Sequence, residues 1–133
     1  MDRELHPHLT TEERRRLFHE GLDLFNRQEF YACHEAFEEI WRSRTPEPKD
    51  LFQGLIQIAV GFFHFEVRAR PHVARRVLAK GRKRLAGFSP ASHGLDIARL
   101  LRQVEPWDRW LAAPSATPPP HPRIHVLNAL DIR

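Results

Sequence analysis

The sequence predicts an all-α protein: a single small bundle of about five helices, built on an antiparallel helical hairpin and followed by a Pro-rich extended C-terminal strap. Three observations support this fold class. Apolar residues recur at helical spacing in most of the chain, short proline- or charge-rich stretches separate these segments, and 133 residues with 41% hydrophobic content suit one domain with one core.

The first two helices form the predicted hairpin. Thr10 followed by Glu13 is a capping-box pattern, so a helix should run over residues 11–26, where leucine and phenylalanine recur at helical spacing. A connection of only a few residues leads into a second apolar stripe that ends before the loop "SRTPEP". Such a short connection favours an antiparallel hairpin.

The later segments complete the bundle. A third helix over about 48–69 is apolar around most of its circumference and should be central. A fourth begins near Pro71 and stops near Gly87, and a fifth covers 95–104, where Pro106 breaks the pattern and leaves "WDRWLAA" one or two further turns. We therefore expect a bundle domain over residues 1–113 and a strap with a tail over 114–133.

Composition and segment lengths limit the setting. The lone Cys33 cannot form an internal disulfide, the N-terminus lacks the apolar core of a signal peptide, and the longest apolar run, 51–65, is too short to span a membrane. These features favour a cytoplasmic protein with no membrane association. Arginine outnumbers lysine 18 to 3, a thermophile-like balance.

Charge is unevenly distributed along the chain. Residues 1–66 hold 8 basic and 13 acidic side chains, a formal −5, whereas residues 67–133 hold 13 basic and 4 acidic, a formal +9. Acidic and basic helices could face each other within one fold or across two subunits. Together with the apolar tail, this asymmetry predicts a homo-oligomer, with a dimer favoured.

The stretch "CHEAFEEIWR" carries the most chemistry. At 100° per residue, His34, Glu38 and Trp41 share one stripe at the edge of the buried face of the second helix, while Glu35 and Glu39 project away from it. A histidine and a carboxylate at i and i+4 can both reach one metal ion. They can equally form a hydrogen bond at the core edge with no further role. Both interpretations stay open.

The third helix offers partners for this stripe. One side of it carries Asp50, Gln53, Gln57, His64 and Arg68, together with Gly54 and Gly61. Glycine costs roughly 1 kcal/mol relative to alanine inside a helix, so another backbone or a ligand should approach there. If this side faces the second helix, the candidate pocket consists of His34, Glu38, Trp41, Gln57 and His64.

These two segments carry a family resemblance. The pattern H-x-x-x-E-x-x-W at His34, Glu38 and Trp41, followed by "QGLIQ" at 53–57, resembles the family of small bacterial and archaeal helical proteins catalogued as domain of unknown function 309. The resemblance covers about residues 15–87. It implies an all-α fold and suggests a metal-binding role for the motif, and no activity comes with it.

The fourth helix is basic and has no acidic residue among its charges. Phosphate contacts are therefore a second alternative, although no aromatic residue is available there for base stacking. The candidate residues are Arg75, Arg76, Lys80, Arg82, Lys83 and Arg84. The remaining histidines, His121 among them, share no spacing and are expected at the surface.

Three functions follow from these patterns. The leading hypothesis is a binding or interaction module with the polar pocket named above. The first alternative is a metal-dependent, hydrolase-like enzyme that holds a divalent metal ion with His34 and Glu38 and uses His64 as a third ligand or base. The second is a nucleic-acid-binding protein that uses the fourth helix.

Overall fold

Five helices and one hairpin of two very short strands follow one another in the computed structural model, which describes residues 8–132. The elements are α1 (Thr11–Asn26), α2 (Phe30–Arg42), α3 (Lys49–Glu66), α4 (Pro71–Ala86), β1 (Ala91–Ser92), β2 (Leu95–Asp96) and α5 (Ile97–Ala112). β1 and β2 are antiparallel and pair Ser92 with Leu95. The predicted all-α class is therefore confirmed. None of the described helices is long and apolar enough to cross a membrane.

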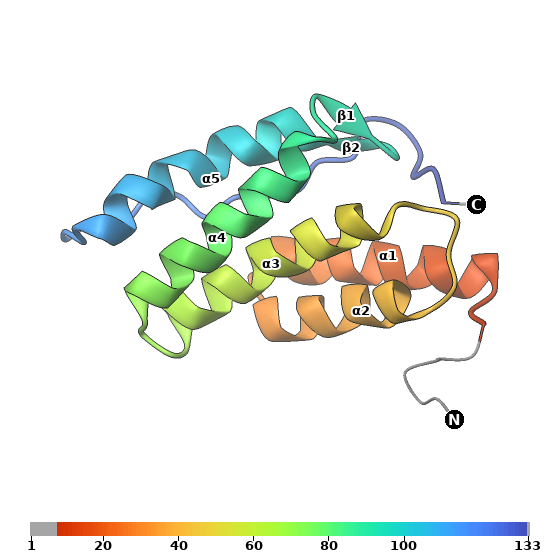
Figure 1. The fold of residues 1–133 in the computed structure, drawn as a ribbon, viewed down its shortest axis with the longest axis horizontal. Coiled ribbons are helices and arrows are strands. Elements are labelled where there is room, and N and C mark those ends of the chain that lie inside the picture. Colours follow the sequence, from red (N-terminus) through yellow and green to blue (C-terminus); the bar gives the residue numbers. More distant parts are fainter. Residues whose placement is uncertain (1–7, 133) are drawn as a thin grey trace.

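Local signals set the hairpin of α1 and α2. Thr10 accepts a hydrogen bond from the Glu13 amide at 3.0 Å, and the Glu13 carboxylate accepts one from the Thr10 amide at 2.8 Å, so the predicted capping box is present. Gln28 adopts a φ of 64° in the turn between the helices. Consecutive helices pack on one another along the chain, which places α3 between α2 and α4 and leaves α5 beside α4 (Figure 1).

The core joins the hairpin to α3 through aromatic rings. Phe18 makes edge-to-face contacts with Phe37 and Phe52, with ring centroids 5.9 and 5.7 Å apart. All three phenylalanines are fully buried. Such pairs stabilise a core by about 0.5–1.5 kcal/mol beyond their buried area, so these rings fix α1 against both α2 and α3.

The glycines of α3 face α4. A Cβ built at Gly54 would lie 2.7 Å from Leu85 Cδ2, and one built at Gly61 would lie 2.6 Å from Leu78 Cδ2. The absent side chains therefore let the two helices approach closely. The expectation that another element approaches this side of α3 was right, and that element is α4.

Helix α5 differs from its predicted extent. It continues through Pro106 to Ala112, whereas the sequence predicted a break there. Proline inside a helix costs about 3 kcal/mol because it removes a backbone donor. Here Trp107 and Leu111 lie beyond the proline and are fully buried, so their packing holds the second half of α5 in place.

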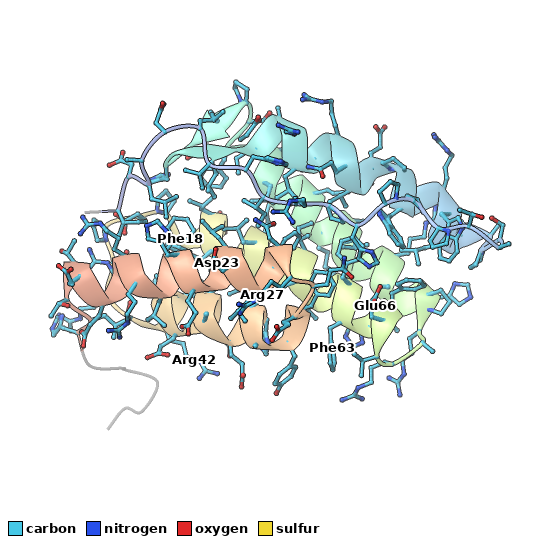
Figure 2. All side chains as sticks on the ribbon, turned by 180° about the vertical axis from the view of Figure 1, so that it is seen from behind. Phe18, Asp23, Arg27, Arg42, Phe63 and Glu66 are labelled. Carbon is cyan, nitrogen blue, oxygen red and sulfur yellow. The ribbon has the colours of Figure 1, made fainter. Side chains whose placement is uncertain are left out.

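The C-terminal strap crosses the side of the molecule that carries α1 and α5 (Figure 2). The Asn26 side chain accepts from the Ile124 amide at 2.8 Å and donates to its carbonyl at 3.0 Å, while the Gln103 side chain bonds both backbone groups of Arg123. Ile124 and Ile132 are buried. The apolar tail that the sequence left open to the bundle or to a second subunit therefore docks on its own bundle.

His121 corrects a further expectation. Its ring lies in the strap against Phe30, Phe62 and Trp107, with centroids 5.4 to 6.0 Å away, and its Nε2 pairs with Glu66. It is therefore part of the packing between strap and bundle and not a free surface residue. Neighbouring residues gave no sign of this, because all four partners lie far away in the sequence.

Candidate functional site

His34 and Glu38 are both half-buried and lie beside the buried face of α2. His34 Nδ1 donates to the carbonyl oxygen of Tyr31 at 2.8 Å, because a carbonyl can only accept. Its Nε2 lies 3.9 Å from Glu38 Oε1. The same carboxylate oxygen accepts from Arg42 Nη2 at 3.2 Å. Glu38 thus pairs with Arg42 and lies beside His34 on its own helix.

Trp41, the third motif residue, takes part in the contacts that close the carboxyl end of α2. Its backbone carbonyl accepts a hydrogen bond from Lys49 Nζ, which also donates to the Ser43 carbonyl at 2.9 Å. The Lys49 ammonium lies 5.6 Å from the centroid of the Trp41 ring. A cation at a helix C-terminus satisfies free carbonyls and interacts favourably with the helix dipole.

The polar side of α3 is divided between two neighbours. Gln57 Oε1 accepts from Arg84 Nε at 3.1 Å, and Arg84 Nη1 pairs with Asp50 at 2.8 Å. Gln57 and Asp50 therefore engage α4. Further along α3, His64 lines the same pocket as His34. The structure thus brings His34 and His64 to one pocket, and it couples Gln57 to Arg84.

This pocket lies between the first half of α2 and the second half of α3 and has a volume of about 120 Å³. Two imidazoles and an aromatic wall surround it. Its lining residues are Phe30, Tyr31, His34, Val60, Phe63 and His64. We call it the α2–α3 pocket. Glu38 and Trp41 lie further along α2 and do not line it.

His64, one of the residues that line this pocket, carries an unsatisfied polar atom. Its Nδ1 is buried and has no hydrogen-bond partner among residues 8–132. Burial lowers the pKa of His64 from its ordinary value of 6.5, and the nearby charges of Arg68 and Arg70 lower it further. The ring is therefore neutral at pH 7, with one nitrogen that donates and one that accepts.

Tyr31 and Phe63 form the outer wall of the pocket and were missed by the sequence reasoning. Their ring centroids are 5.2 Å apart, and Tyr31 is 52% exposed. On their other side lies a second hollow of about 440 Å³ next to Glu66 and the exposed Val67. Phe63 and Glu66 lie at the end of α3 near the start of α2 (Figure 2). In the sequence, a tyrosine three residues before His34 was the feature that could have indicated an aromatic wall beside it.

Two possible metal ligands, His34 and Glu38, lie next to each other. The described part of the chain contains no group of three or more His, Cys, Asp or Glu side chains arranged to hold a metal ion. His34 Nε2 and Glu38 Oε1 point to the same region, but Arg42 competes for the carboxylate. The described residues therefore supply an incomplete ligand set at this position.

The basic residues of α4 divide into two groups. Arg84 pairs with α3 as above, and Arg75 donates to both carboxylate oxygens of Asp108 on α5 at 3.1 and 3.3 Å. Arg82 approaches the same aspartate at 4.0 Å. The second group, Arg76, Lys80 and Lys83, makes no hydrogen bond or ion pair with a described residue. Half of the predicted phosphate-contacting set therefore has a structural role.

The site lies within the part of the sequence that matches a known protein family. Residues 18–77 match the family described as Domain of unknown function (DUF309), which confirms the resemblance seen in the motif. The matched region contains α2, α3 and the whole α2–α3 pocket. No curated protein and no solved structure matches the chain.

Proposed function

We propose that this protein is an interaction module whose α2–α3 pocket receives one side chain of a partner protein. The proposal rests on one observation: the pocket is lined by aromatic rings and by His64, and the buried Nδ1 of His64 has no partner within the described chain. Buried polar groups nearly always have hydrogen-bond partners, and leaving one unmade costs about 1–3 kcal/mol. A bound group that supplies this partner would recover that free energy.

The size of the pocket favours a side chain over a metabolite. Pockets for drug-sized ligands commonly measure about 300–1,000 Å³, whereas an apolar cavity of about 150 Å³ holds a single benzene. At about 120 Å³, the α2–α3 pocket suits one ring or one short aliphatic group. The exposed Tyr31 and Val67 beside it supply apolar surface for the rest of a partner segment.

The chemistry of the pocket favours a tyrosine-like group. A neutral His64 offers either a donor or an acceptor at Nδ1, and a hydroxyl can pair with both because it donates and accepts. Tyr31 and Phe63 would contact the ring of such a group edge to face. We therefore expect p-cresol, which reproduces the tyrosine side chain, to bind more tightly than toluene, which lacks the hydroxyl.

NMR titration of the histidine ring signals tests this proposal. Millimolar p-cresol should shift the signals of His34 and His64 to saturation, with weaker binding of toluene. His64→Phe should remove the preference for p-cresol, and His19→Phe, an exposed position on α1, should leave it unchanged. Ring signals that do not move with either compound, or equal affinities in the parent protein, would contradict the proposal.

A metal-binding role is the second candidate, and one observation favours it. Metal-binding histidines usually donate their other ring nitrogen to a carbonyl or carboxylate, as His34 Nδ1 does to Tyr31. Its Nε2 is then a lone pair near Glu38. Elemental analysis of protein purified without a histidine tag should show bound zinc or manganese that His34→Ala loses. Metal-free protein with unchanged melting in added zinc would rule this candidate out.

A further inference from the structure

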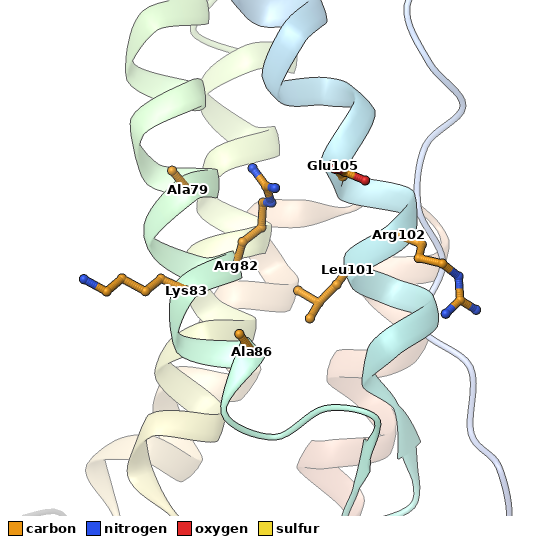
Figure 3. Close-up of a pocket in the computed structure, with 7 residues that line it drawn as sticks. All are labelled: Ala79, Arg82, Lys83, Ala86, Leu101, Arg102 and Glu105. Carbon is orange, nitrogen blue, oxygen red and sulfur yellow. The ribbon is translucent and has the colours of Figure 1, made fainter.

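A groove between α4 and α5 has a different chemistry from the α2–α3 pocket. Its volume is about 420 Å³. The small residues Ala79 and Ala86 lie on α4, Arg82 and Leu101 reach between the two helices, and Lys83 and Arg102 point outward on opposite sides (Figure 3). Its residues are Ala79, Arg82, Lys83, Ala86, Leu101, Arg102 and Glu105. We call it the basic groove.

The two rims of the groove are positively charged and turned outward. Lys83 projects from the α4 wall and Arg102 from the α5 wall (Figure 3). Both are exposed, and neither has a hydrogen bond or an ion pair with a described residue. Arg82 is held closer to the floor, 4.0 Å from Asp108. With Glu105 as the single lining acid, the groove has a net positive charge.

A surface of opposite charge lies on α2 of the same chain. Its outer face carries Glu35, Glu38 and Glu39 with one arginine, Arg42, and these four residues line a shallow hollow. We call this face the acidic ridge. Glu35 and Glu39 are exposed and have no hydrogen bond or ion pair with another described residue. The ridge therefore has a net negative charge, with one opposite charge at its end.

The ridge and the groove also match in length. Residues 35–42 of α2 and residues 79–86 of α4 each cover seven helical steps, which is about 10.5 Å at 1.5 Å per residue. The alanines of the groove allow a helix backbone to approach, and Leu101 offers it an apolar contact. A helix laid along the groove with its acidic face inward would bring its carboxylates near the Lys83 and Arg102 side, and such complementary charges favour a specific contact.

We propose that the acidic ridge of one copy of this protein docks in the basic groove of a second copy. Within one chain, α2 packs on α1 and α3, whereas the groove lies on α4 and α5 across the bundle (Figure 1). The contact therefore joins two different surfaces, head to tail. It is independent of the α2–α3 pocket, because none of the groove residues lines that pocket.

Sedimentation equilibrium of the full chain tests the proposal. The parent protein should associate at about 20 mM salt and dissociate at about 500 mM, because salt screens exposed charges. Glu35→Lys/Glu39→Lys and Lys83→Glu/Arg102→Glu should each be monomeric, since like charges then meet. An equimolar mixture of the two variants should associate again, because each then offers the charge that the other lacks.

A matched control separates docking from net charge. Glu20→Lys/Asp23→Lys on the exposed face of α1 carries the same net charge as the ridge variant and should associate like the parent. A parent protein that is monomeric at about 20 mM salt and millimolar concentration, a mixture that stays monomeric, or a control that behaves like the ridge variant would overturn the proposal. So would a groove that binds a short DNA oligonucleotide while the protein remains monomeric.

Discussion

Lys49 closes the carboxyl end of α2 by binding the backbone carbonyl of Trp41 while its ammonium lies beside the Trp41 ring. The same ammonium donates to the Ser43 carbonyl. Burial lowers the pKa of Lys49 from its ordinary value of 10.5. Trp41 therefore contributes to the motif region by fixing where α2 ends, and it does not contribute to the α2–α3 pocket.

Removing this cation should destabilise the protein. Lys49→Met keeps the aliphatic stem but leaves the α2 carbonyls without their donor, so we expect the free energy of unfolding to fall by about 1 kcal/mol. Urea denaturation measures this difference. Lys80→Met, at an exposed position on α4, is the control and should change stability little; equal losses in both variants would argue against a helix-closing role.

Glu38→Gln should have only a small effect on stability. A pair buried at the core edge would cost about 1–3 kcal/mol when broken, but Glu38 is 31% exposed and its partners lie on its own helix. Exposed i,i+4 ion pairs contribute about 0.3–0.5 kcal/mol, and we expect a loss of that order. Urea denaturation of this variant beside Glu35→Gln checks it. A loss above 2 kcal/mol would show that Glu38 belongs to a stronger network than these contacts describe.

Glu47 should be far more sensitive than Glu38. Its carboxylate lies 3.7 Å from Arg14 Nε, and both side chains are almost fully buried, at 3% and 7% exposure. Removing one charge from a buried ion pair commonly costs 3–5 kcal/mol. Thermal denaturation of Glu47→Gln should therefore show a large fall in Tm. Glu29→Gln, which disrupts the exposed Arg27 pair, is the control with little expected change.

The sequence predicted what local chemistry determines and missed what distant contacts determine. The Thr10 capping box is formed within four residues, and its prediction was confirmed. Helix α5 passes Pro106 because Trp107 packs on Phe62 and Phe65, residues of another helix. His34 and Glu38 could be placed on one face of α2 by helical geometry alone. Which side of α3 faces α2 depends on how α3 packs against α4. The sequence therefore could not show whether Gln57 lies beside His34 or beside α4.

Cys33 should react only in unfolded protein. It is fully buried on the core face of α2, and burial strongly raises the pKa of its thiol. Thiolate is the reactive form, so modification by a disulfide reagent such as dithionitrobenzoate should be slow in buffer and fast in urea. The rate should follow the unfolded fraction through the transition. Rapid modification of the native protein at neutral pH would contradict the assignment of Cys33 to the core.

His64 should make stability depend on pH in a definite direction. Its pKa in the folded protein lies below the ordinary value of 6.5, so the unfolded chain binds a proton more readily than the folded one. The contribution of His64 to stability is therefore fully present above about pH 7 and is lost as the pH falls from the unfolded pKa towards the folded one. The chain contains eight other histidines, so the comparison that isolates this effect is the parent against His64→Gln. The parent should lose more unfolding free energy between pH 7 and 5 than His64→Gln does, whereas His19→Gln should lose as much as the parent. Equal slopes for the parent and His64→Gln would show that the His64 ring takes up a proton in the fold as readily as in water.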